Sequence, residues 1–556
     1  MDWDSDGSLH DPGNTSEVSP SSDEDAGGIA TTSNSASTSP SISASFGQSS
    51  SPANRNVIWF AEKDNPLLGS PPSTNSRVKV KVNGEFPVDY FLGLITEKYM
   101  NDLVEQSCLY AFQNGKENFK LTISELKVFL GITLVMTYVK YPRVRLYWSS
   151  DTGLKLSLVA ENMTINRYEE IRRYLHFTDS SRIPADNRDK LIKIRPFLDF
   201  LHKSFHNALD PEEFQSIDEM MIPFKGRSSL KNYLPKKPKK WGYKTWVRAG
   251  VSGYVFCFEL YQGASEQPPS ECGASGDVVL RFCHDIHHLN VKVYADNFFS
   301  SLPLVRKLKE IGVWYVGTCR ENRLKDAVKK LKDVKDIKKG GRGSSSIATS
   351  SDGITVARWF DNNVVHTISS YAGIQPMGKA KRWCKRNKEY VDVNRPVSIE
   401  IYNKHMGGVD LMDSLVALYR NDIRNSRWYM RIFYHMLNVA VVNAWLLWRK
   451  SNNVPIDLLE FKSRVANGLI FSGKAAQSRK RGRSNSTSPS SLPTKKKPSH
   501  KVIDELRLSK CGHYPKKIES NNANRCRDKR CTSKTRYMCG TCLVPLCPDC
   551  FESFHS

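Results

Sequence analysis

The chain has 556 residues and a formal net charge of +25 at pH 7, with 82 Lys and Arg against 57 Asp and Glu. This length allows several domains with ample cores, and the charge favours a polyphosphate partner such as nucleic acid. No run of 18 or more uninterrupted apolar residues occurs, and polar residues interrupt the most apolar stretch, from Trp428 to Trp448. We therefore expect a buried helix there and no membrane span. The basic balance alone also fits ribosomal and chromatin proteins.

Residues 1–80 are predicted to form a disordered, acidic and serine-rich tail. The first 55 residues hold eight acids, one arginine and almost no aromatic residues, so they cannot bury enough apolar surface to fold. Words such as SPSSDEDAGG suit phosphorylation, and they equally suit a plain solvated tail. We expect no secretory signal, because the N-terminus lacks a basic region followed by an apolar one.

The middle of the chain alternates between helical and strand patterns. Residues 81–212 repeat apolar positions at spacings of three and four, which predicts helices. Residues 213–320 hold a hairpin, made of TWVRAGVS and YVFCFELYQG, and then strands joined by helices. Residues 321–398 are rich in strands, and residues 399–470 again favour helices. The sequence therefore predicts a multidomain α/β protein.

Three aspartates stand in distinctive contexts: Asp218 in QSIDEMMIPFKGRS, Asp296 in VKVYADNFFSS and Asp410 in YNKHMGGVDLMD. The first two each close a run that reads as a buried strand, so each carboxylate is predicted at a strand's C-terminal end. Asp410 falls in a segment with helical spacing. Carboxylates held together bind pairs of Mg²⁺ ions about 3.5–4 Å apart for phosphoryl transfer. Any one of them alone is more typical of a turn residue or a helix cap.

The words DEMMIPFKGRSSLKNYLPKKPKKWGYKTW, YADNFFSSLPLVRKLKEIGVWYVGTCR and YNKHMGGVDLMD occur in this order and resemble the piggyBac transposase family. The likeness runs from about Phe91 to the C-terminus. It implies a DDE/D transposase with catalytic acids at Asp218, Asp296 and Asp410, which would bind two Mg²⁺ ions, and an accessory acid at Asp413. The chemistry implied is DNA cleavage with a hairpin at the transposon end, and then joining at TTAA target sites.

The resemblance also implies a domain organisation. Residues 81–212 would assist dimerisation and DNA binding, and residues 213–320 would begin an RNase H-like catalytic core. The order of strands, first antiparallel and then joined by helices, suits such a sheet. Residues 321–398 would be a β-rich insertion, and residues 399–470 would complete the core. We expect a homodimer or a higher assembly, because two DNA ends must be paired.

Two basic clusters are predicted to contact DNA. The interval from Lys225 to Arg248 holds nine Lys or Arg, no acids and four aromatic residues, and aromatic rings can stack on unpaired bases. The alternative is a solvated loop whose Trp residues belong to the core. In the second cluster, Arg420, Arg424, Arg427 and Arg431 share roughly one face of a helix, for DNA or for solvent. The predicted contacts are Lys225, Arg227, Lys236, Lys237, Lys239, Lys240, Trp241, Lys244, Arg424 and Arg427.

Two further words carry weaker signals. The word FCHDIHHLN is too compressed for a standard zinc motif, so we interpret it as a polar loop before the Asp296 strand. Residues 471–505 form a basic linker in which RKRGR and KKK are separated by a Ser-rich spacer. This arrangement predicts a bipartite import signal and a nuclear location. The alternative is a linker that only adds affinity for phosphate.

Seven of the 13 cysteines crowd into the last 46 residues, which favours a reducing compartment and a local metal site in residues 506–556. Cys and His pairs suit tetrahedral Zn²⁺, and so short a segment lacks a sufficient apolar core. We predict two structural Zn²⁺ ions in an interleaved, cross-braced arrangement, with Cys511 as an alternative to His513. The gap between Cys526 and Cys531 is wider than is usual in the family. The predicted ligand sets are Cys526, Cys531, Cys547 and Cys550, and His513, Cys539, Cys542 and His555.

The resemblance implies that this zinc module recognises transposon-end DNA, whereas other ring-shaped zinc modules bind proteins. The sequence thus predicts a nuclear, metal-dependent DNA transposase. The main alternative is a transposase-derived DNA-binding protein without transposition activity, with chromatin proteins as partners. A ubiquitin ligase is a third reading, and it would need an exposed apolar groove formed by Leu543, Val544, Pro545 and Leu546.

Overall fold

The structure is a computed structural model that describes residues 57–64, 76–80, 82, 84–151, 153–235, 237–264, 267–385, 387–452, 456–478, 507–508, 512–519, 523–528 and 531–556. Residues 1–56, most of the basic linker with its predicted import signal, Lys236 and Cys511 lie outside these ranges. Side chains of residues 473–478 are also outside the description.

Helices form the region that precedes the sheet, as the spacing of apolar residues predicts. Threonines cap three of them: Thr96 and Thr164 accept hydrogen bonds from the backbone N–H groups of Tyr99 and Arg167, and Thr122 forms a capping box with Glu125. The helices are α1 (Pro87–Leu94), α2 (Glu97–Gln113), α3 (Ile123–Tyr138), α4 (Ser157–Ala160), α5 (Ile165–Tyr174) and α6 (Arg195–Ala208), with 3-10 turns at Val144–Trp148 and Ser180–Arg182.

One large sheet carries most of the strands. Its order is β1-β8-β9-β10-β7-β6-β2-β4-β3, and β5 also pairs with β4. The pairs β2/β6 and β6/β7 are parallel, while the other pairs are antiparallel. The strands are β1 (Trp59–Ala61), β2 (Phe214–Pro223), β3 (Asn232–Tyr233), β4 (Trp241–Gly250), β5 (Val255–Leu260), β6 (Lys292–Ala295), β7 (Trp314–Thr318), β8 (Ser345–Ser350), β9 (Thr355–Phe360) and β10 (Val364–Ser369).

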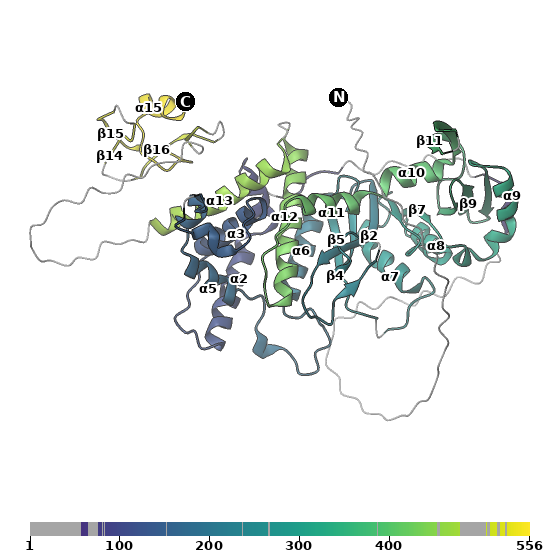
Figure 1. Cartoon of the computed structure of the whole chain (residues 1–556), viewed down its shortest axis with the longest axis horizontal. Coiled ribbons are helices and arrows are strands. Elements are labelled where there is room, and N and C mark those ends of the chain that lie inside the picture. The colour runs from purple at the N-terminus through teal and green to yellow at the C-terminus, as the bar shows by residue number, and fades with distance from the viewer. Residues whose placement is uncertain are drawn as a thin grey trace, which may run out of the picture. The chain divides into compact units, whose positions relative to one another are not determined.

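Helices make the two parallel connections, because parallel strands need a crossover. The chain runs from β5 through α7 (Gly273–Phe282) to β6, and through α8 (Leu302–Glu310) to β7. Figure 1 shows both helices beside the sheet. Short elements follow β7: 3-10 turns at Glu321–Arg323 and Lys325–Lys330, and α9 (Val334–Lys339). Another 3-10 turn, His284–Ile286, follows α7.

The segment predicted as a β-rich insertion is continuous with this sheet. β10 pairs with β7 along Thr367–Ser369, so β8, β9 and β10 extend the same ladder of hydrogen bonds beyond residue 320. Which strand edges meet is a long-range property, and the sequence pattern of each strand does not reveal it. Only the hairpin of β11 (Gly378–Cys384) and β12 (Glu389–Arg395) forms a separate two-stranded sheet in this segment.

The predicted tail ends earlier than residue 80, which corrects the sequence interpretation. β1 pairs antiparallel with β8, and Trp59 is buried. The Asp64 carboxylate accepts hydrogen bonds from the backbone N–H groups of Ile374 and Gln375. Trp59 gives this segment a buried apolar side chain, while its neighbours Ile58 and Phe60 are exposed.

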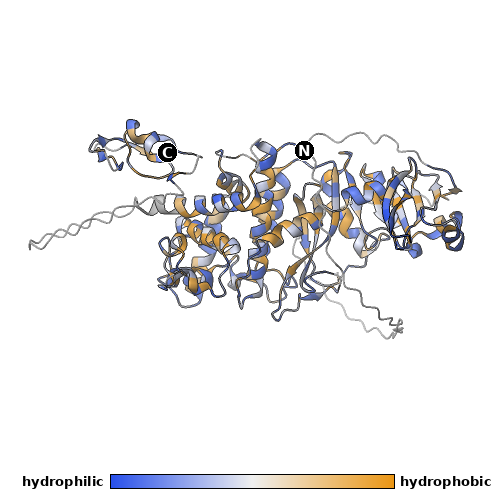
Figure 2. Cartoon of the chain, turned by 45° about the horizontal axis from the view of Figure 1, so that its top comes forward, coloured by the Kyte–Doolittle hydropathy of each residue, from blue (hydrophilic) through white to orange (hydrophobic). Residues whose placement is uncertain are grey.

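Four long elements complete the described core: α10 (Val397–His405), α11 (Gly408–Leu418), α12 (Trp428–Ser451) and α13 (Leu458–Ser478). Helix α13 therefore extends into the predicted linker. Among the described residues α12 is the helix long and apolar enough to cross a membrane, and 89% of its apolar window is buried. Figure 2 shows apolar colouring along this helix, which agrees with the predicted buried helix. α13 approaches α3 closely: a Cβ at Gly131 would lie 2.7 Å from the backbone oxygen of Ala466.

The C-terminal residues form a small module of their own. Its strands are β13 (Pro515–Lys517) paired with β16 (Tyr537–Cys539), and β14 (Asn524–Arg525) paired with β15 (Lys534–Thr535). A helix, α15 (Pro548–His555), ends the chain. Its buried core consists mainly of cysteines together with Val544 and Leu546.

Candidate catalytic and metal sites

Asp218 and Asp296 are brought together by the parallel pairing of β2 and β6. The last paired residues are Ile217 and Ala295. Asp218 and Asp296 directly follow these two residues, so the two aspartates lie at the same level of the sheet. Asp296 lies directly after β6, as predicted. Asp218 lies within β2, not at its end, because β4 pairs with β2 as far as Pro223. The apolar run before Asp218 is the part of β2 that pairs with β6. Strand β2 itself continues to Pro223, where its pairing with β4 ends.

Helix α11 brings Asp410 to the same place. Side chains alternate along a strand, so Ser216 and Asp218 share one face of β2. The Oγ of Ser216 accepts a hydrogen bond of 3.2 Å from the backbone N–H of Val409. A Cβ at Gly408 would lie 2.9 Å from that Oγ and closer still to the backbone oxygen of Gly250. Only glycine permits this approach, and it sets the first turn of α11 beside Asp218.

The charges of the three aspartates act on one neighbouring hydroxyl. The pKa of Tyr402 is raised to about 12, chiefly by burial; a hydrogen bond with Thr318 lowers it, and the carboxylates of Asp296, Asp218 and Asp410 contribute to the increase. The sequence interpretation missed Tyr402, Ser216 and Gly408. The paired glycines in HMGGVDL were the available signal for Gly408, while Tyr402 carried none.

Burial raises the pKa of Asp218 to about 7. The charge of Lys237 and a hydrogen bond of 2.7 Å from the backbone N–H of Glu219 lower this pKa, while Glu219 and Asp296 raise it. Asp296 accepts a hydrogen bond of 2.9 Å from the backbone N–H of Phe298. A carboxylate with a pKa near neutrality is a common feature of functional sites.

Lys237, predicted as a DNA contact, lies among the acids. Its ammonium group is 3.7 Å from an oxygen of Asp410, and its side chain is only 19% exposed. Its charge also lowers the pKa of Asp413, which burial raises. A cation thus stands beside the acids, where opposite charge is needed to offset their mutual repulsion.

The acid cluster offers hard oxygen donors of the kind that Mg²⁺ prefers. Asp410 is 72% exposed on its side chain, and the buried Oδ1 of Asp413 and Oε2 of Glu219 have no hydrogen-bond donor among the described residues. The aspartate oxygens do not form a group within 4.8 Å of one another: the two such groups among the described residues both lie in the C-terminal module. Because Mg²⁺ keeps several waters, this looser arrangement of carboxylates still fits it.

The basic interval after Asp218 divides into exposed and buried parts. Tyr233 and Trp241 are exposed, with ring centroids 4.8 Å apart and ring planes tilted at 46°, and Lys231 lies over the Trp241 ring. Tyr243, in contrast, is buried. Lys244 lies 4.0 Å from Glu219 and is mostly buried. The predicted contacts that the structure leaves exposed are Lys225, Arg227, Lys239, Lys240 and Trp241.

The arginine cluster does not form a helical face, which corrects the prediction. α11 ends at Leu418 and α12 begins at Trp428, so Arg424 and Arg427 lie in the loop between them. Arg427 donates hydrogen bonds to the backbone oxygens of Leu175 and Arg172, and Arg431 donates to that of Pro223. These hydrogen bonds fix the loop and the start of α12 to the end of α5 and to β2. Arg424 remains exposed.

The word FCHDIHHLN has a structural role. Asp285 forms ion pairs with the fully buried Arg248 and with His206 at 2.9 Å. Burial opposes ionisation of Asp285, but these two partners hold its pKa at about 2. The predicted polar loop before the Asp296 strand corresponds to the 3-10 turn His284–Ile286 and the residues between it and β6.

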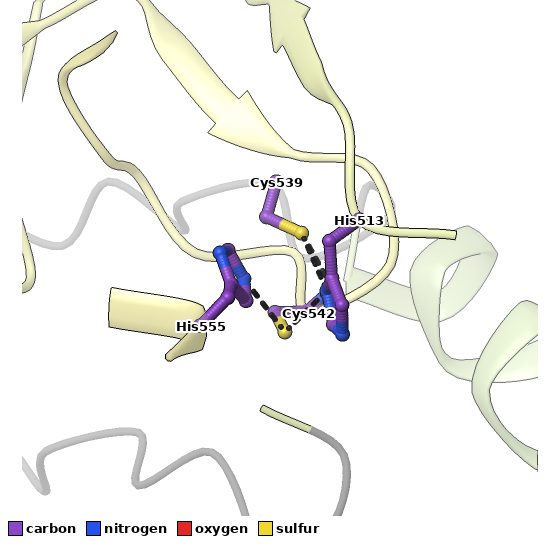
Figure 3. A group of neighbouring side chains, drawn as sticks. All are labelled: His513, Cys539, Cys542 and His555. Carbon is purple, nitrogen blue, oxygen red and sulfur yellow. Dashed lines mark hydrogen bonds between the residues drawn. The ribbon is translucent and has the colours of Figure 1, made fainter. Parts of the chain in front are cut away.

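The C-terminal module brings its cysteines and histidines into two groups. One holds Cys526, Cys531, Cys547 and Cys550, and the other holds His513, Cys539, Cys542 and His555 (Figure 3). In each group the ligand atoms lie within 4.8 Å of one another. These are the two interleaved sets that the spacing predicted.

The distances fit tetrahedral coordination. Bonds of about 2.3 Å to sulfur and 2.0–2.1 Å to nitrogen place sulfur atoms about 3.8 Å apart, and sulfur and nitrogen about 3.6 Å apart. The Sγ atoms of Cys531 and Cys547 are 3.7 Å apart. The Nδ1 of His513 lies 3.3 Å from the Sγ of Cys539 and 3.4 Å from that of Cys542.

Hydrogen bonds orient these donors. The Nδ1 of His555 lies 2.7 Å from the backbone oxygen of Phe551, which can only accept. Nδ1 therefore carries the proton, and the lone pair of Nε2 points toward Cys542 at 3.4 Å. Backbone N–H groups of Cys542 and Cys547 donate to the sulfurs of Cys539 and Cys526, which fixes the positions of these two sulfur atoms.

Val544 and Leu546 are buried in this module, and Leu543 is the exposed member of the four apolar residues that a ubiquitin ligase would need. The described surface therefore lacks the apolar groove on which that third reading depends.

Residues 86–445 match the protein-family model described as Transposase IS4, and this places the chain in the transposase class. PiggyBac transposable element-derived protein 3 of Homo sapiens is 32% identical over 485 residues, which cover 84% of this chain and 78% of that protein. PiggyBac transposable element-derived protein 2 of Homo sapiens is 29% identical over 505 residues, covering 90% and 81%. The chain belongs to the piggyBac transposase family, which confirms the resemblance found in its sequence.

A solved structure shares the fold. It is the cryo-EM structure of a piggyBac transposase synaptic complex with hairpin DNA, with a TM-score of 0.61 and 19% identity. The similarity covers 86% of this chain and 99% of that chain.

Proposed function

We propose that this chain is a metal-dependent DDE/D transposase that cleaves DNA at transposon ends and joins them to TTAA target sites. The observation that carries the proposal is the convergence of Asp218, Asp296 and Asp410 from β2, β6 and α11. The paired residues Ile217 and Ala295 support it, and so does the combined effect of the three carboxylates on the pKa of Tyr402.

The sheet supports an RNase H-like assignment for the catalytic core. Strands β5, β4 and β2 are successively antiparallel, and β6 and β7 then continue in parallel with β2. Two helices make the crossovers. In this assignment Asp218 and Asp296 lie where the parallel pairing of β2 and β6 ends, and the ends of parallel strands are the usual place for sites in sheets of this kind.

Asp218, Asp296 and Asp410 would hold two Mg²⁺ ions, and Asp413 would support them from the next turn of α11. Bound there, the ions would supply Lewis-acid stabilisation of the attacking and leaving oxygens of an in-line displacement. The chain itself orients Asp218 and Asp296 through the backbone N–H groups of Glu219 and Phe298. Lys237 offsets the negative charge beside Asp410.

Two Zn²⁺ ions would hold the C-terminal module together, one on each group of four ligands. The module has few apolar residues to fold on, so metal binding would supply much of its folding free energy. We assign to this module the recognition of DNA at the transposon end. Exposed Lys516, Lys517 and Arg525 on its strands suit contacts with phosphate.

The partner proposed is double-stranded DNA, and the chain would act as a homodimer that pairs two ends. We place it in the nucleus, on the strength of the two basic clusters of its linker. The solved neighbour is a synaptic complex with hairpin DNA, and this supports a DNA substrate here.

The test is cleavage of a labelled DNA duplex that carries the repeat flanking the gene and TTAA, with Mg²⁺, by wild type and Asp296→Asn. Nicking or hairpin formation that requires Mg²⁺ and disappears in the variant would establish the proposal. Salt-sensitive binding without cleavage by either protein would instead support the alternative, a transposase-derived DNA- or chromatin-binding protein.

A further inference from the structure

The hairpin of β11 and β12 presents an aromatic pair on its outer face. Trp383 and Tyr390 are register partners, and their ring centroids lie 5.2 Å apart at 68°. Trp383 is 50% exposed and Tyr390 is 71% exposed. Single exposed apolar residues are ordinary on a protein surface. A directly opposed pair of large rings is not, because burying them would remove a large apolar area from water.

The inner face of the hairpin is firmly packed, so the exposure of the outer face is a property of a fixed element. Ala380 and Val393 are paired and buried, and Val393 packs against Trp359. The indole N–H of Trp359 donates a hydrogen bond of 2.8 Å to the backbone oxygen of Asn394. Arg382 forms an ion pair with Asp361 at 2.8 Å. Figure 1 shows β11 at the periphery, next to β9 and α10.

Lysines surround the aromatic pair. Lys379 and Lys381 alternate with the inward residues of β11 and so share the outer face with Trp383, and Lys385 and Lys388 lie in the connecting loop. All four are exposed, and Asp392, the register partner of Lys381, is an exposed acid on the same face. Lysines also protect free strand edges from aggregation, but that role needs no aromatic pair. Cations beside exposed rings match a ligand with phosphates and flat, apolar faces.

We propose that this outer face binds single-stranded DNA, with Trp383 and Tyr390 stacking on unpaired bases and the lysines neutralising the adjacent phosphates. Every base offers a face for stacking, so such a platform tolerates any sequence. In a duplex the bases already stack on one another, and the rings would gain little. The inference rests on the proposed function for its choice of DNA, since cutting and joining expose unpaired strand ends.

The test uses the full-length protein with its zinc, without added Mg²⁺, and a fluorescein-labelled 20-nucleotide strand, alone or annealed to its complement. Fluorescence anisotropy gives Kd for both. The double variant Trp383→Ala/Tyr390→Ala should bind the single strand about 5-fold to 150-fold more weakly for each base that loses its stack. Its Kd for the duplex should stay within about threefold.

Conservative and control variants separate stacking from other roles. Trp383→Phe/Tyr390→Phe keeps both rings and should restore most of the single-strand affinity. Phe60→Ala removes another exposed ring, 39% exposed on β1, and should leave both Kd values unchanged. Lys379→Ala/Lys381→Ala should reduce the slope of log K against log salt for the single strand by about 0.7 per lysine.

Unchanged single-strand affinity in the double alanine variant would overturn the inference, and so would an equal loss for single strand and duplex. Failure of the proposed function looks different. If wild type cleaves no DNA with Mg²⁺ but the double variant loses single-strand binding, the hairpin inference stands while the transposase proposal fails. If wild type cleaves DNA but the double variant keeps its single-strand affinity, the transposase proposal stands while the hairpin inference fails.

Discussion

Replacing Asp218 with asparagine removes a carboxylate that burial makes costly to ionise, and keeps an oxygen that can accept the hydrogen bond from the N–H of Glu219. The pKa of Asp218 rises from 3.8 to about 7 on folding. A raised pKa means that the folded state binds the proton more tightly than the unfolded state. The stability that protonation contributes is complete below about pH 4 and is lost as pH rises through 7.

The full shift corresponds to about 4 kcal/mol at about 1.4 kcal/mol per pKa unit, as an upper bound, because Asp218 keeps some contact with solvent. Most of this stabilisation by protonation, roughly 2–3 kcal/mol, is lost as the pH rises from 5 to 8. For a folded chain of several hundred residues, the entropy of unfolding is so large that a change of 1 kcal/mol in unfolding free energy shifts Tm by about 1 °C. Asp218→Asn should therefore gain about 2–3 °C in Tm over wild type between pH 5 and pH 8.

Thermal unfolding, followed by circular dichroism in chelator-free buffer without Mg²⁺, measures this gain at each pH. Asp186→Asn, an exposed aspartate outside the acid cluster, serves as the matched control and should not respond to pH in this way. Adding Mg²⁺ at pH 8 should raise Tm in wild type and not in Asp218→Asn. A variant that melts with or below wild type at pH 8 would refute the assignment of the pKa shift to burial.

Five further substitutions test the remaining structure. Gly408→Ala adds a Cβ where the helix meets β2 and should lower the cleavage rate about 100-fold with DNA affinity unchanged in gel shifts; full activity would argue against the close approach. Lys237→Ala removes the cation beside the acids and should tighten Ca²⁺ binding several-fold by calorimetry. Weaker binding would contradict the idea that the lysine ammonium group competes with a metal ion for the carboxylates. Cys526→Ser should reduce bound zinc from two ions to one per chain in elemental analysis. An unchanged zinc content would contradict the assignment of Cys526 as a ligand. Arg427→Ala should lower unfolding stability by roughly 2–4 kcal/mol, because it removes charged hydrogen bonds to backbone oxygens, while Arg424→Ala should only reduce the salt dependence of DNA binding by a slope of about 0.9.

Several features could be predicted because they depend on local chemistry. Apolar spacing identified the helices before the sheet and the buried α12, and apolar runs identified β6 and β7. The spacing of Cys539, Cys542, Cys547 and Cys550 follows from how a short chain must turn to bring sulfur atoms near one ion. The structure brings these residues into the two groups that this spacing indicated.

Other features could not be read from the sequence, because they depend on partners distant along the chain. Arg424 and Arg427 have helical spacing, but the chain is not helical there, and the carbonyls that hold Arg427 come from α5 and its end. Lys237 belongs to a basic word that favours DNA contact, yet the fold places it beside Asp410. A basic side chain has the same appearance in sequence whether its partner is a phosphate or a carboxylate.

The sequence by itself identified the family, and it predicted the three aspartates and the ligand sets of the C-terminal module, with Cys511 as an alternative to His513, since each is carried by short words of characteristic residues. Tertiary structure decided that β8, β9 and β10 continue the sheet of β7, and that Asp218 lies within its strand at the level of Asp296. It also decided the approach of Gly408 to Ser216. Strand edges, registers and close backbone contacts are set by hydrogen bonds between distant segments, so only the folded chain defines them.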